Sequence, residues 1–388
     1  MSFLYSLDPL FEYRFVPPPF VIDNQTKRRR FSLEKLFLLL SGTDDYVHLT
    51  DPASPKFLSS LREQGFDFGL PWSEGEFIPS DCKIKEWGDA HDLVSGNLIP
   101  NQNKIAISQY LNSKINQREW KEELGLSPLR TKLLRSEEQL IEFLEDTTFP
   151  LVLKGAYGIA GRNHIIIENQ SQGWKLQQIA KKLFGFPIYA EEWVGSERIL
   201  DFSTLWEFRE DGPLYLGSTE MIVDIDGSFR GISMSSRKES QLTHVLPRCL
   251  EVIKAVYVSS EVKPIGPAAM DGFLFRKDTN VNAQVFSEIN FRYSMGRILY
   301  EIRKKRLLKE VESGIVFLPL HKIKAFNEEA WLQKIKNEFG SDFFFVTPTA
   351  DSKGKPFQTI GLYYQLKDGS YNANEMLPSL FQDWMSLA

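Results

Sequence analysis

The spacing of apolar residues changes several times along the chain, and each change predicts a new helix or strand. Residues 32–42 (SLEKLFLLLSG) have helical spacing between a serine that can cap the helix and a glycine that can end it. Residues 45–50 (DYVHLT) predict a strand and residues 54–65 (SPKFLSSLREQG) a short helix, whereas residues 1 to about 30 predict irregular structure. A strand followed by a helix indicates a small α/β unit, which we expect to close near residue 100.

Beyond residue 101 the pattern is mostly helical to about residue 145, and strands then dominate. Residues 149–167 (FPLVLKGAYGIAGRNHIII) predict two strands joined by a glycine-rich loop, and residues 172–185 an amphipathic helix. The later strands are separated mainly by turns, with helices between groups of strands, which is typical of an α+β architecture on antiparallel sheet. These strands are expected over residues 187–194, 199–208, 214–224, 227–234, 272–276, 283–292, 342–350 and 358–369.

Composition indicates an ordinary folded protein of 388 residues, of which 42% are hydrophobic and 25% charged. This length suggests two or three packed units. The formal net charge of -5 argues against a general nucleic-acid binder, which normally carries a basic surplus. We expect the one basic cluster, Lys27 to Arg30, to coat a surface near the N-terminus.

Cysteine usage indicates a reducing compartment, and hydropathy predicts no membrane helix. Cys82 and Cys249 are far apart and have no second Cys or His at metal-ligand spacing, so neither a disulfide framework nor a zinc site is expected. The longest aliphatic run, residues 36–40, is far below the roughly 18 residues that a membrane helix requires. We therefore expect a cytoplasmic protein with neither a membrane nor a nucleic-acid partner.

The loop after residue 153 has the composition of a phosphate-binding loop but fits no common phosphate motif. Lys154 precedes Gly155, Gly158 and Gly161, whereas a Walker A lysine follows its glycines, and the next residues favour a strand over a helix. Glycines let backbone N–H groups approach phosphate oxygens, and Arg162 adds a cation. A lysine on the entering strand resembles the kinase arrangement, but the other kinase signatures are missing. The loop alone is equally consistent with a plain glycine hairpin.

Downstream acids favour the phosphate interpretation. Glu288 and Asn290 are two residues apart on a predicted strand, so they share a face and present oxygen ligands. Asp271 lies on an earlier predicted strand, and two antiparallel strands can bring it beside Glu288. Such a group suits Mg²⁺ that bridges the β- and γ-phosphates of a nucleotide. A solvated surface charge is the alternative for each carboxylate taken singly.

The order of these parts along the chain resembles that of the ATP-grasp superfamily, over roughly residues 100 to 310. The matching elements are a lysine at the start of the module (Lys104), the segment LVLKGAYGIAGR, an acidic strand end, and Asp271 followed by the ExNxR pattern that contains Glu288. The resemblance implies an ATP-grasp fold in which two α+β lobes clamp the nucleotide, preceded by a small α/β pre-ATP-grasp domain. The implied units are residues 1–100, 101–315 (small lobe about 130–195, large lobe about 196–315) and a small C-terminal α/β unit, 316–388.

The resemblance also implies roles for residues that the chemistry alone would not identify. Lys104 would join Lys154 on the phosphates. Glu191 and the backbone from Glu192 to Val194 would meet the adenine edge, and Glu197, or alternatively Asp201, would face the ribose. Arg237 or Lys238 would add a cation for an acyl phosphate, with a solvated turn as the alternative.

The implied activity is ATP-dependent activation of a carboxylate as an acyl phosphate, which an amine then attacks. Lys154, the loop N–H groups and Mg²⁺ would neutralise the transferring phosphoryl group. Arg292, two residues past Asn290, is placed to hold a carboxylate or to stabilise an oxyanion. A small-molecule kinase and a catalytically inactive nucleotide-binding protein stay open as alternatives. Small-molecule carboxylate and amine substrates are expected, and a homodimer is left open.

Overall fold

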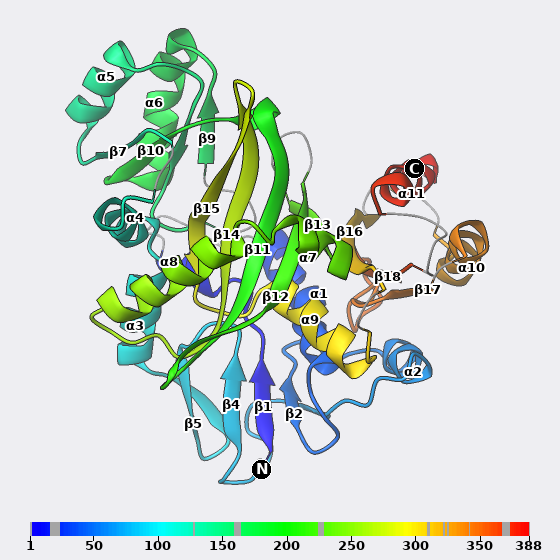
Figure 1. The fold of residues 1–388 in the computed structure, drawn as a ribbon. Coiled ribbons are helices and arrows are strands. Elements are labelled where there is room, and N and C mark those ends of the chain that lie inside the picture. Colours follow the sequence, from blue (N-terminus) through cyan, green and yellow to red (C-terminus); the bar gives the residue numbers. More distant parts are fainter. Residues whose placement is uncertain are drawn as a thin grey trace.

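A four-stranded parallel sheet forms the N-terminal domain (Figure 1). The computed structural model describes residues 2–15, 24–126, 129–158, 164–223, 229–308, 311–320, 323, 326–340, 342–366 and 373–387. The order of the sheet is β3-β2-β1-β4, and a hairpin of β5 and β6 follows it. The strands are β1 (Phe3–Ser6), β2 (Tyr46–His48), β3 (Leu70–Trp72), β4 (Lys83–Glu86), β5 (His91–Val94) and β6 (Asn97–Pro100).

The N-terminal helices differ in part from the expectation. Helix α1 (Asn24–Leu33) begins well before Ser32, the expected cap, and continues into the 3-10 helix η2 (Glu34–Leu39). The first ten residues, expected to be irregular, contain β1, because this short strand lies between two partners that bury Leu4 completely. Helix α2 (Pro55–Glu63) starts as predicted, with Ser54 as its cap. A further 3-10 helix, η1 (Phe11–Phe15), follows β1.

A separate small lobe lies at the upper left of Figure 1. Its antiparallel sheet has the order β7-β10-β8-β9, and two helices pack on it through Leu140, Leu144 and Ala180. Helices α3 (Gln102–Asn112) and α4 (Lys114–Glu123) lead into this lobe, and Ser113 between them caps α4. The elements of the lobe are β7 (Thr131–Leu134), α5 (Glu137–Asp146), β8 (Leu151–Lys154), β9 (His164–Ile167), α6 (Gln170–Phe184) and β10 (Ile188–Glu192).

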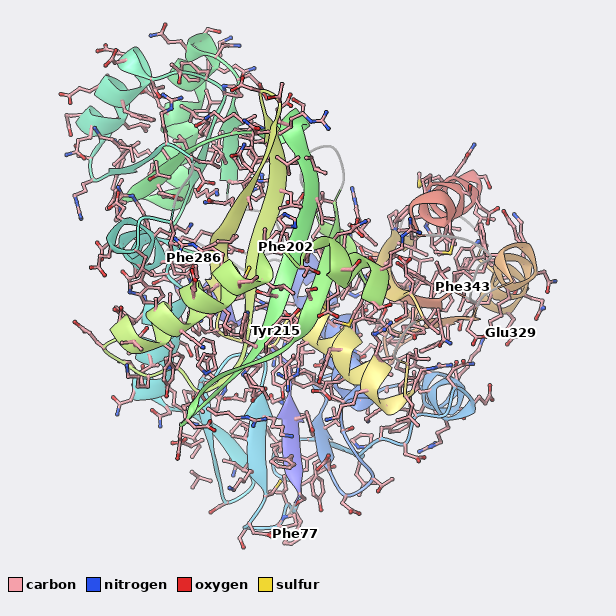
Figure 2. The ribbon with its side chains drawn as sticks, in the orientation of Figure 1. Phe77, Phe202, Tyr215, Phe286, Glu329 and Phe343 are labelled. Atoms are coloured by element: carbon pink, nitrogen blue, oxygen red, sulfur yellow. The ribbon has the colours of Figure 1, made fainter. Side chains whose placement is uncertain are left out.

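The large lobe is built on an eight-stranded antiparallel sheet of order β15-β14-β11-β12-β13-β16-β18-β17. Side chains alternate between the two faces of this sheet, and each face packs on its own core. Phe202 of β11 packs with Phe286 beneath helix α8 (Figure 2). Leu205 packs on the opposite face, toward helix α9 and the N-terminal domain. The elements are η3 (Gly195–Glu197), β11 (Arg198–Arg209), β12 (Gly212–Val223), β13 (Phe229–Met234), α7 (Ser236–Gln241), α8 (Leu246–Ser259), β14 (Gly266–Lys277), β15 (Asn280–Asn290) and α9 (Met295–Lys305).

The C-terminal residues continue the same sheet. Strands β16 (Ser313–Pro319), β17 (Asp342–Phe345) and β18 (Thr359–Gln365) extend it, so the expected boundary at 315/316 falls inside β16. Helices α10 (Glu328–Phe339) and α11 (Ala373–Ser386) cover these strands over a core that contains Phe343, Trp331 and Trp384. The mixed α/β and α+β class is confirmed. Among the described residues, none of the helices has the length and apolar character needed to cross a membrane.

Candidate functional site

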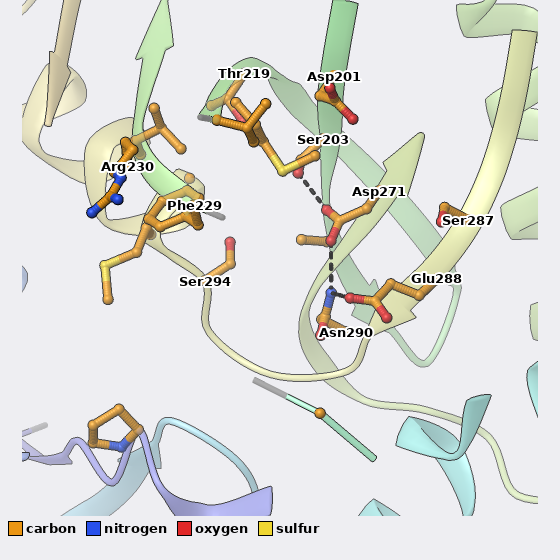
Figure 3. A pocket seen from close by; sticks show the side chains of 18 of the residues that line it. Asp201, Ser203, Thr219, Phe229, Arg230, Asp271, Ser287, Glu288, Asn290 and Ser294 are labelled. Atoms are coloured by element: carbon orange, nitrogen blue, oxygen red, sulfur yellow. Dashed lines mark hydrogen bonds between the residues drawn. The ribbon is translucent and has the colours of Figure 1, made fainter. Parts of the chain in front are cut away.

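A cleft of about 550 Å³ lies where the small lobe, the large sheet and the N-terminal domain meet. Residues from all three parts line it, among them Lys154 of β8, Asp271 of β14 and Trp87 of the N-terminal domain. Figure 3 shows the side of the cleft where Asp201, Ser203, Asp271, Glu288 and Asn290 lie together. The sequence predicted this convergence of the β8 lysine with the acids of β14 and β15.

Lys154 at the end of β8 is held by a buried carboxylate. Its Nζ lies 2.5 Å from Oε1 of Glu191 on the paired strand β10, and the hydroxyl of Tyr189 donates to the other oxygen of Glu191 at 2.8 Å. Burial opposes the charge of Glu191, but the ammonium groups of Lys154 and Lys121 outweigh it and lower the pKa of Glu191 to about 2. Lys154 therefore stands at the cleft wall with a fixed orientation.

Two further lysines on α4 line the cleft, and the sequence reasoning missed both. Lys114 pairs with Glu288, and the ammonium of Lys121 donates to the carbonyl of Ser287. Burial lowers the pKa of Lys114 to about 8 and that of Lys121 to about 7. Their spacing of seven residues, two helical turns, places both on one face of α4, and this spacing after the capping serine is the signal that could have identified them.

Lys104, which the resemblance placed on the phosphates, does not line the cleft. Its ammonium lies 3.1 Å from Asp89, 3.2 Å from Asp92 and 2.9 Å from the carbonyl of His91. These acceptors belong to the N-terminal domain and hold the side chain beside the β5–β6 hairpin. This expectation is corrected, and Lys114 of the next helix occupies the position beside the acids.

The acids of β14 and β15 are direct neighbours. Asp271 is opposite Glu288 in the strand register, and it accepts hydrogen bonds from the hydroxyl of Ser203 and, at 3.0 Å, from the amide nitrogen of Asn290 (Figure 3). Burial raises the pKa of Asp271 to about 6, against the opposing effects of the Ser203 hydrogen bond, Arg292 and Lys114. Two adjacent carboxylates are thus available, one of them only partly ionised near pH 6.

The carboxylate oxygens of Asp271 and Glu288 fit a Mg²⁺ ion that a bound ligand also coordinates. No group of three or more His, Cys, Asp or Glu side chains that could hold a metal occurs within the described ranges. Mg²⁺ in nucleotide sites takes one or two carboxylates plus phosphate oxygens and water, and Asp271 with Glu288 meets that requirement. The amide oxygen of Asn290, a third expected ligand, instead accepts from Arg292 at 2.9 Å.

Arg292 follows β15 and lines the cleft next to these acids. Its Nε lies 2.5 Å from Glu12 of η1, a guanidinium nitrogen donates to the carbonyl of Tyr293 at 3.1 Å, and the guanidinium carbon lies 5.5 Å from the centre of the Trp87 ring. Contacts on several sides fix the planar group, which is the condition for bidentate binding of a carboxylate.

An aromatic and cationic group forms the wall beside η3. The rings of His164 and Trp193 are stacked with centres 6.4 Å apart, and the guanidinium of Arg198 lies 4.8 Å from Trp193 and 4.0 Å from Phe273. Asp201 pairs with Arg198 at 2.6 Å. All five residues line the cleft, so this wall offers flat apolar surfaces beside one carboxylate.

The carboxylates of Glu191 and Glu197, expected at the adenine and the ribose, lie elsewhere, and the expected adenine contact of the backbone from Glu192 to Val194 stays a prediction. Glu191 is buried behind Lys154, and Glu192 lies 3.6 Å from Lys277. The side chain of Val194 packs on a small core with Leu129, Phe273 and Phe275, and Glu197 is exposed. None of these four side chains lines the cleft, whereas Asp201, the alternative for the ribose, does. Trp193 lines the cleft here, because the end of β10 turns its ring toward the cleft and the carboxylates of Glu191 and Glu192 away from it.

The glycine loop is described only in part. Gly155 is buried directly after Lys154, and Gly158 lines the cleft. Gly161 and Arg162 lie outside the described residues, as does the side chain of Lys238. Their expected contacts with phosphate stay predictions.

Comparison with known proteins supports the fold. No protein-family model matches the chain, and no curated protein matches it in sequence. Among solved structures, it is similar to an N5-carboxyaminoimidazole synthase from Aspergillus clavatus in complex with ADP and 5-aminoimidazole ribonucleotide, with a TM-score of 0.56, 13% identity, and coverage of 100% of this chain and 98% of that one. It is also similar to a phosphoribosylamine–glycine ligase from Thermotoga maritima, with a TM-score of 0.58, 13% identity, and coverage of 97% and 96%. The chain therefore has the ATP-grasp fold with a pre-ATP-grasp N-terminal domain, as the sequence predicted.

Proposed function

We propose that the protein is an ATP-dependent ligase that activates a small-molecule carboxylate as an acyl phosphate and joins it to an amine. The observation that carries the proposal is the meeting of Lys154 and Lys114 with the Asp271–Glu288 pair in one cleft between two lobes. Cations opposite paired carboxylates are what Mg-ATP requires, because the carboxylates hold the metal and the cations hold the phosphates. The fold neighbours named above include a ligase and a synthase, and one was crystallised with ADP.

Each group has a role in this chemistry. Lys154, Lys114 and Lys121 would neutralise the phosphates, while Asp271 and Glu288 would hold Mg²⁺, which supplies charge neutralisation to the transferring phosphoryl group when bound. Arg292, fixed by Glu12, would orient the carboxylate for attack on that group. The same guanidinium would then stabilise the oxyanion that forms when the amine adds. The Trp193 wall, with Arg198 and Asp201, offers contacts for the adenosine part.

The activity is testable with a general nucleophile. Purified protein, Mg-ATP, pooled carboxylates and hydroxylamine should yield a hydroxamate together with ADP and phosphate. Lys154→Ala and Glu288→Gln should each abolish turnover, whereas Lys104→Ala, the matched loss of a lysine outside the cleft, should leave it unchanged. A phosphorylated acceptor without free phosphate would indicate a kinase, and nucleotide binding without turnover would indicate an inactive binding protein; either result contradicts the proposal.

We further infer that the protein works in a reducing compartment such as the cytoplasm. Both Cys82 and Cys249 are buried and unpaired with each other, which supports this inference. The homodimer that the sequence left open stays untested, and light scattering of the purified protein would test it.

A further inference from the structure

Strand β15 forms one edge of the eight-stranded sheet, and it carries Glu288, one of the two carboxylates assigned above to Mg²⁺. The outer backbone groups of an edge strand have no neighbouring strand with which to pair, and burying them without partners is costly. Helices α3 and α4 pack against β15. How Glu288 is held therefore depends on which groups of these helices pair with the outer backbone of the strand.

Polar side chains of the two helices bond to the backbone of β15 and of the residue that follows it. The ammonium of Lys121 on α4 donates to the carbonyl of Ser287, and Oδ1 of Asn112 on α3 accepts from the N–H of Phe291 at 2.9 Å. Both side chains are buried. Ser287 and Phe291 are an even number of residues apart, which fits one edge of a strand, because the backbone groups of alternate residues point to opposite sides.

Gln117 of α4 pairs with Ile289, the residue halfway between these two. Its Nε2 donates to the carbonyl of Ile289 at 2.6 Å, and its Oε1 accepts from the N–H of Ile289 at 2.8 Å. This exchange of two bonds copies the pairing between two residues of neighbouring antiparallel strands. A carboxamide can make both bonds because it carries a donor and an acceptor, whereas an ionised Glu has only acceptors and Lys has only donors. The side chain of Gln117 is almost fully buried.

Support from the other neighbour of β15, strand β14, is interrupted beside Glu288. The register pairs Asp271 with Glu288 and then Phe273 with Gln284, so the same interval spans two steps on β14 and four steps on β15. Such a bulge breaks the regular ladder of backbone hydrogen bonds locally. Helix α4 therefore supplies backbone bonds at the point where the pairing with β14 is irregular.

Ile289 lies between two side chains of the candidate site. Glu288 pairs with Lys114 and lines the cleft, and the amide of Asn290 donates to Asp271 at 3.0 Å (Figure 3). Both carboxylates therefore depend on the backbone at Ile289, one through its neighbour in sequence and the other through the amide of Asn290. The groups of a metal site have to be held within about 0.5 Å of their productive positions, so the pairing of Ile289 bears directly on metal binding.

We propose that Gln117 is a positioning residue of the reaction. By pairing with the backbone of Ile289, it holds Glu288 and Asn290 in the orientation in which the carboxylates of the cleft can bind Mg²⁺ together with a nucleotide. Gln117 is not among the residues that line the cleft, so it acts through Ile289 and not by contact with a substrate. The inference rests on the proposed ligase function, because it concerns the magnesium site of the same reaction.

Nucleotide binding to the full chain with and without metal tests the proposal. Titration calorimetry gives the Kd of ADP in EDTA and in Mg²⁺, and the ratio of the two values measures the contribution of the metal. Gln117→Met keeps the size of the side chain and removes both bonds to Ile289. We expect the ratio to fall about tenfold in this variant, the typical cost of removing a group that orients a metal ligand, while the Kd in EDTA stays within about twofold of the wild type. An unchanged ratio in the folded variant would overturn the proposal.

Asn116→Leu is the matched control. Asn116 precedes Gln117 on α4, and its amide donates at 3.0 Å to the carbonyl of Tyr110 in α3. The control variant therefore also loses a carboxamide that bonds to backbone, and we expect its ratio to equal that of the wild type. The same fall of the ratio in both variants would show a general loosening of α4 and would overturn the specific role of Gln117.

Hydrogen exchange of the wild-type protein gives a readout that needs no variant. The amide of Ile289 should exchange several-fold more slowly with Mg-ADP than with ADP in EDTA, because metal binding stabilises the arrangement that Gln117 holds. The amide of Leu362 in the C-terminal core is the reference for stabilisation of the whole protein. An equal change at Ile289 and Leu362 would overturn the proposal even if Gln117→Met does not fold.

The positioning role and the ligase function fail in different ways. A failed hydroxamate assay together with the tenfold fall of the ratio in Gln117→Met would refute the ligase function alone. Hydroxamate formation together with an unchanged ratio in that variant would refute the positioning role alone. A ratio of one in the wild-type protein would show that the metal does not contribute to binding, which contradicts both.

Discussion

Glu191 offers the sharpest test of how the cleft is held together. The substitution Glu191→Gln keeps the size of the side chain but removes the charge that faces Lys154 and Lys121. The pKa of Glu191 lies at about 2 compared with the ordinary value of 4.5, and this difference corresponds to ~3 kcal/mol in favour of the charged carboxylate. Because Glu191 is only 3% exposed, solvent screens little of this effect. We therefore expect the variant to lose about 3 kcal/mol of unfolding free energy at pH 7.

The sign of the pH dependence follows from the direction of the shift. A carboxylate whose pKa is lowered by folding contributes its full stabilisation above the unfolded value of 4.5, and the contribution disappears as the pH falls toward 2. Chemical denaturation followed by tryptophan fluorescence at a series of pH values should therefore show wild type and Glu191→Gln converging between pH 4.5 and 2. The control is Glu197→Gln, the same charge change on an exposed side chain of η3, which should not alter stability.

The variant should also respond more strongly to anions. Without the carboxylate, the ammonium groups of Lys154 and Lys121 have lost their common counter-charge, and a diphosphate or triphosphate can supply it. Metal-free ADP should therefore raise the melting temperature of Glu191→Gln by more than it raises that of the wild type. If Glu191→Gln lowers the free energy of unfolding at pH 7 by less than about 1 kcal/mol, the value of an exposed ion pair, the reasoning is refuted.

Three further predictions concern turnover. Lys114→Ala should lower kcat/KM for ATP at least tenfold while Lys104→Ala leaves it unchanged, as measured by ADP release; equal effects would contradict the assignment of Lys114. Burial raises the pKa of Asp271 to about 6, so protonation should remove this metal ligand below that pH. We therefore expect kcat/KM for Mg-ATP to fall about tenfold per pH unit below pH 6. A flat pH profile of kcat/KM down to pH 5 would be inconsistent with this role. Glu12→Gln should raise KM for the carboxylate about tenfold without changing KM for ATP, because Glu12 orients Arg292; an unchanged KM in substrate titrations would show that the other contacts suffice.

The residues that sequence reasoning placed correctly are those whose position follows from local periodicity. Strand alternation put Glu288 and Asn290 on one face, and antiparallel pairing then brought Asp271 opposite Glu288. Lys154 was identified because its strand and loop are contiguous in sequence. In each case one or two strands determine the geometry, so little information from the rest of the chain is needed.

The errors arose where tertiary contacts decide the position. Lys104 and Lys114 are both lysines near helix starts, and only the packing of α4 against β15 brings the second to Glu288 while Asp89 and Asp92 retain the first. Glu191 lies on a strand end that the resemblance assigned to adenine, but its pairing with β8 sets it behind Lys154. The polar run at the start of α1 has no apolar periodicity from which its helix could be predicted.

The C-terminal residues support the cleft from behind, which explains why they continue the sheet. Along β16, Phe317 and Pro319 line the cleft, whereas Val316 and Leu318 point to the opposite face and join the core beneath α10 and α11. That core is buried and rich in aromatic residues, so its packing fixes the position of β16 and with it the position of Phe317. Since Phe317 contacts Phe229 of the neighbouring β13, the C-terminal core helps to set the shape of this part of the cleft. The C-terminal core therefore contributes to the cleft without supplying any of the magnesium or phosphate contacts proposed above.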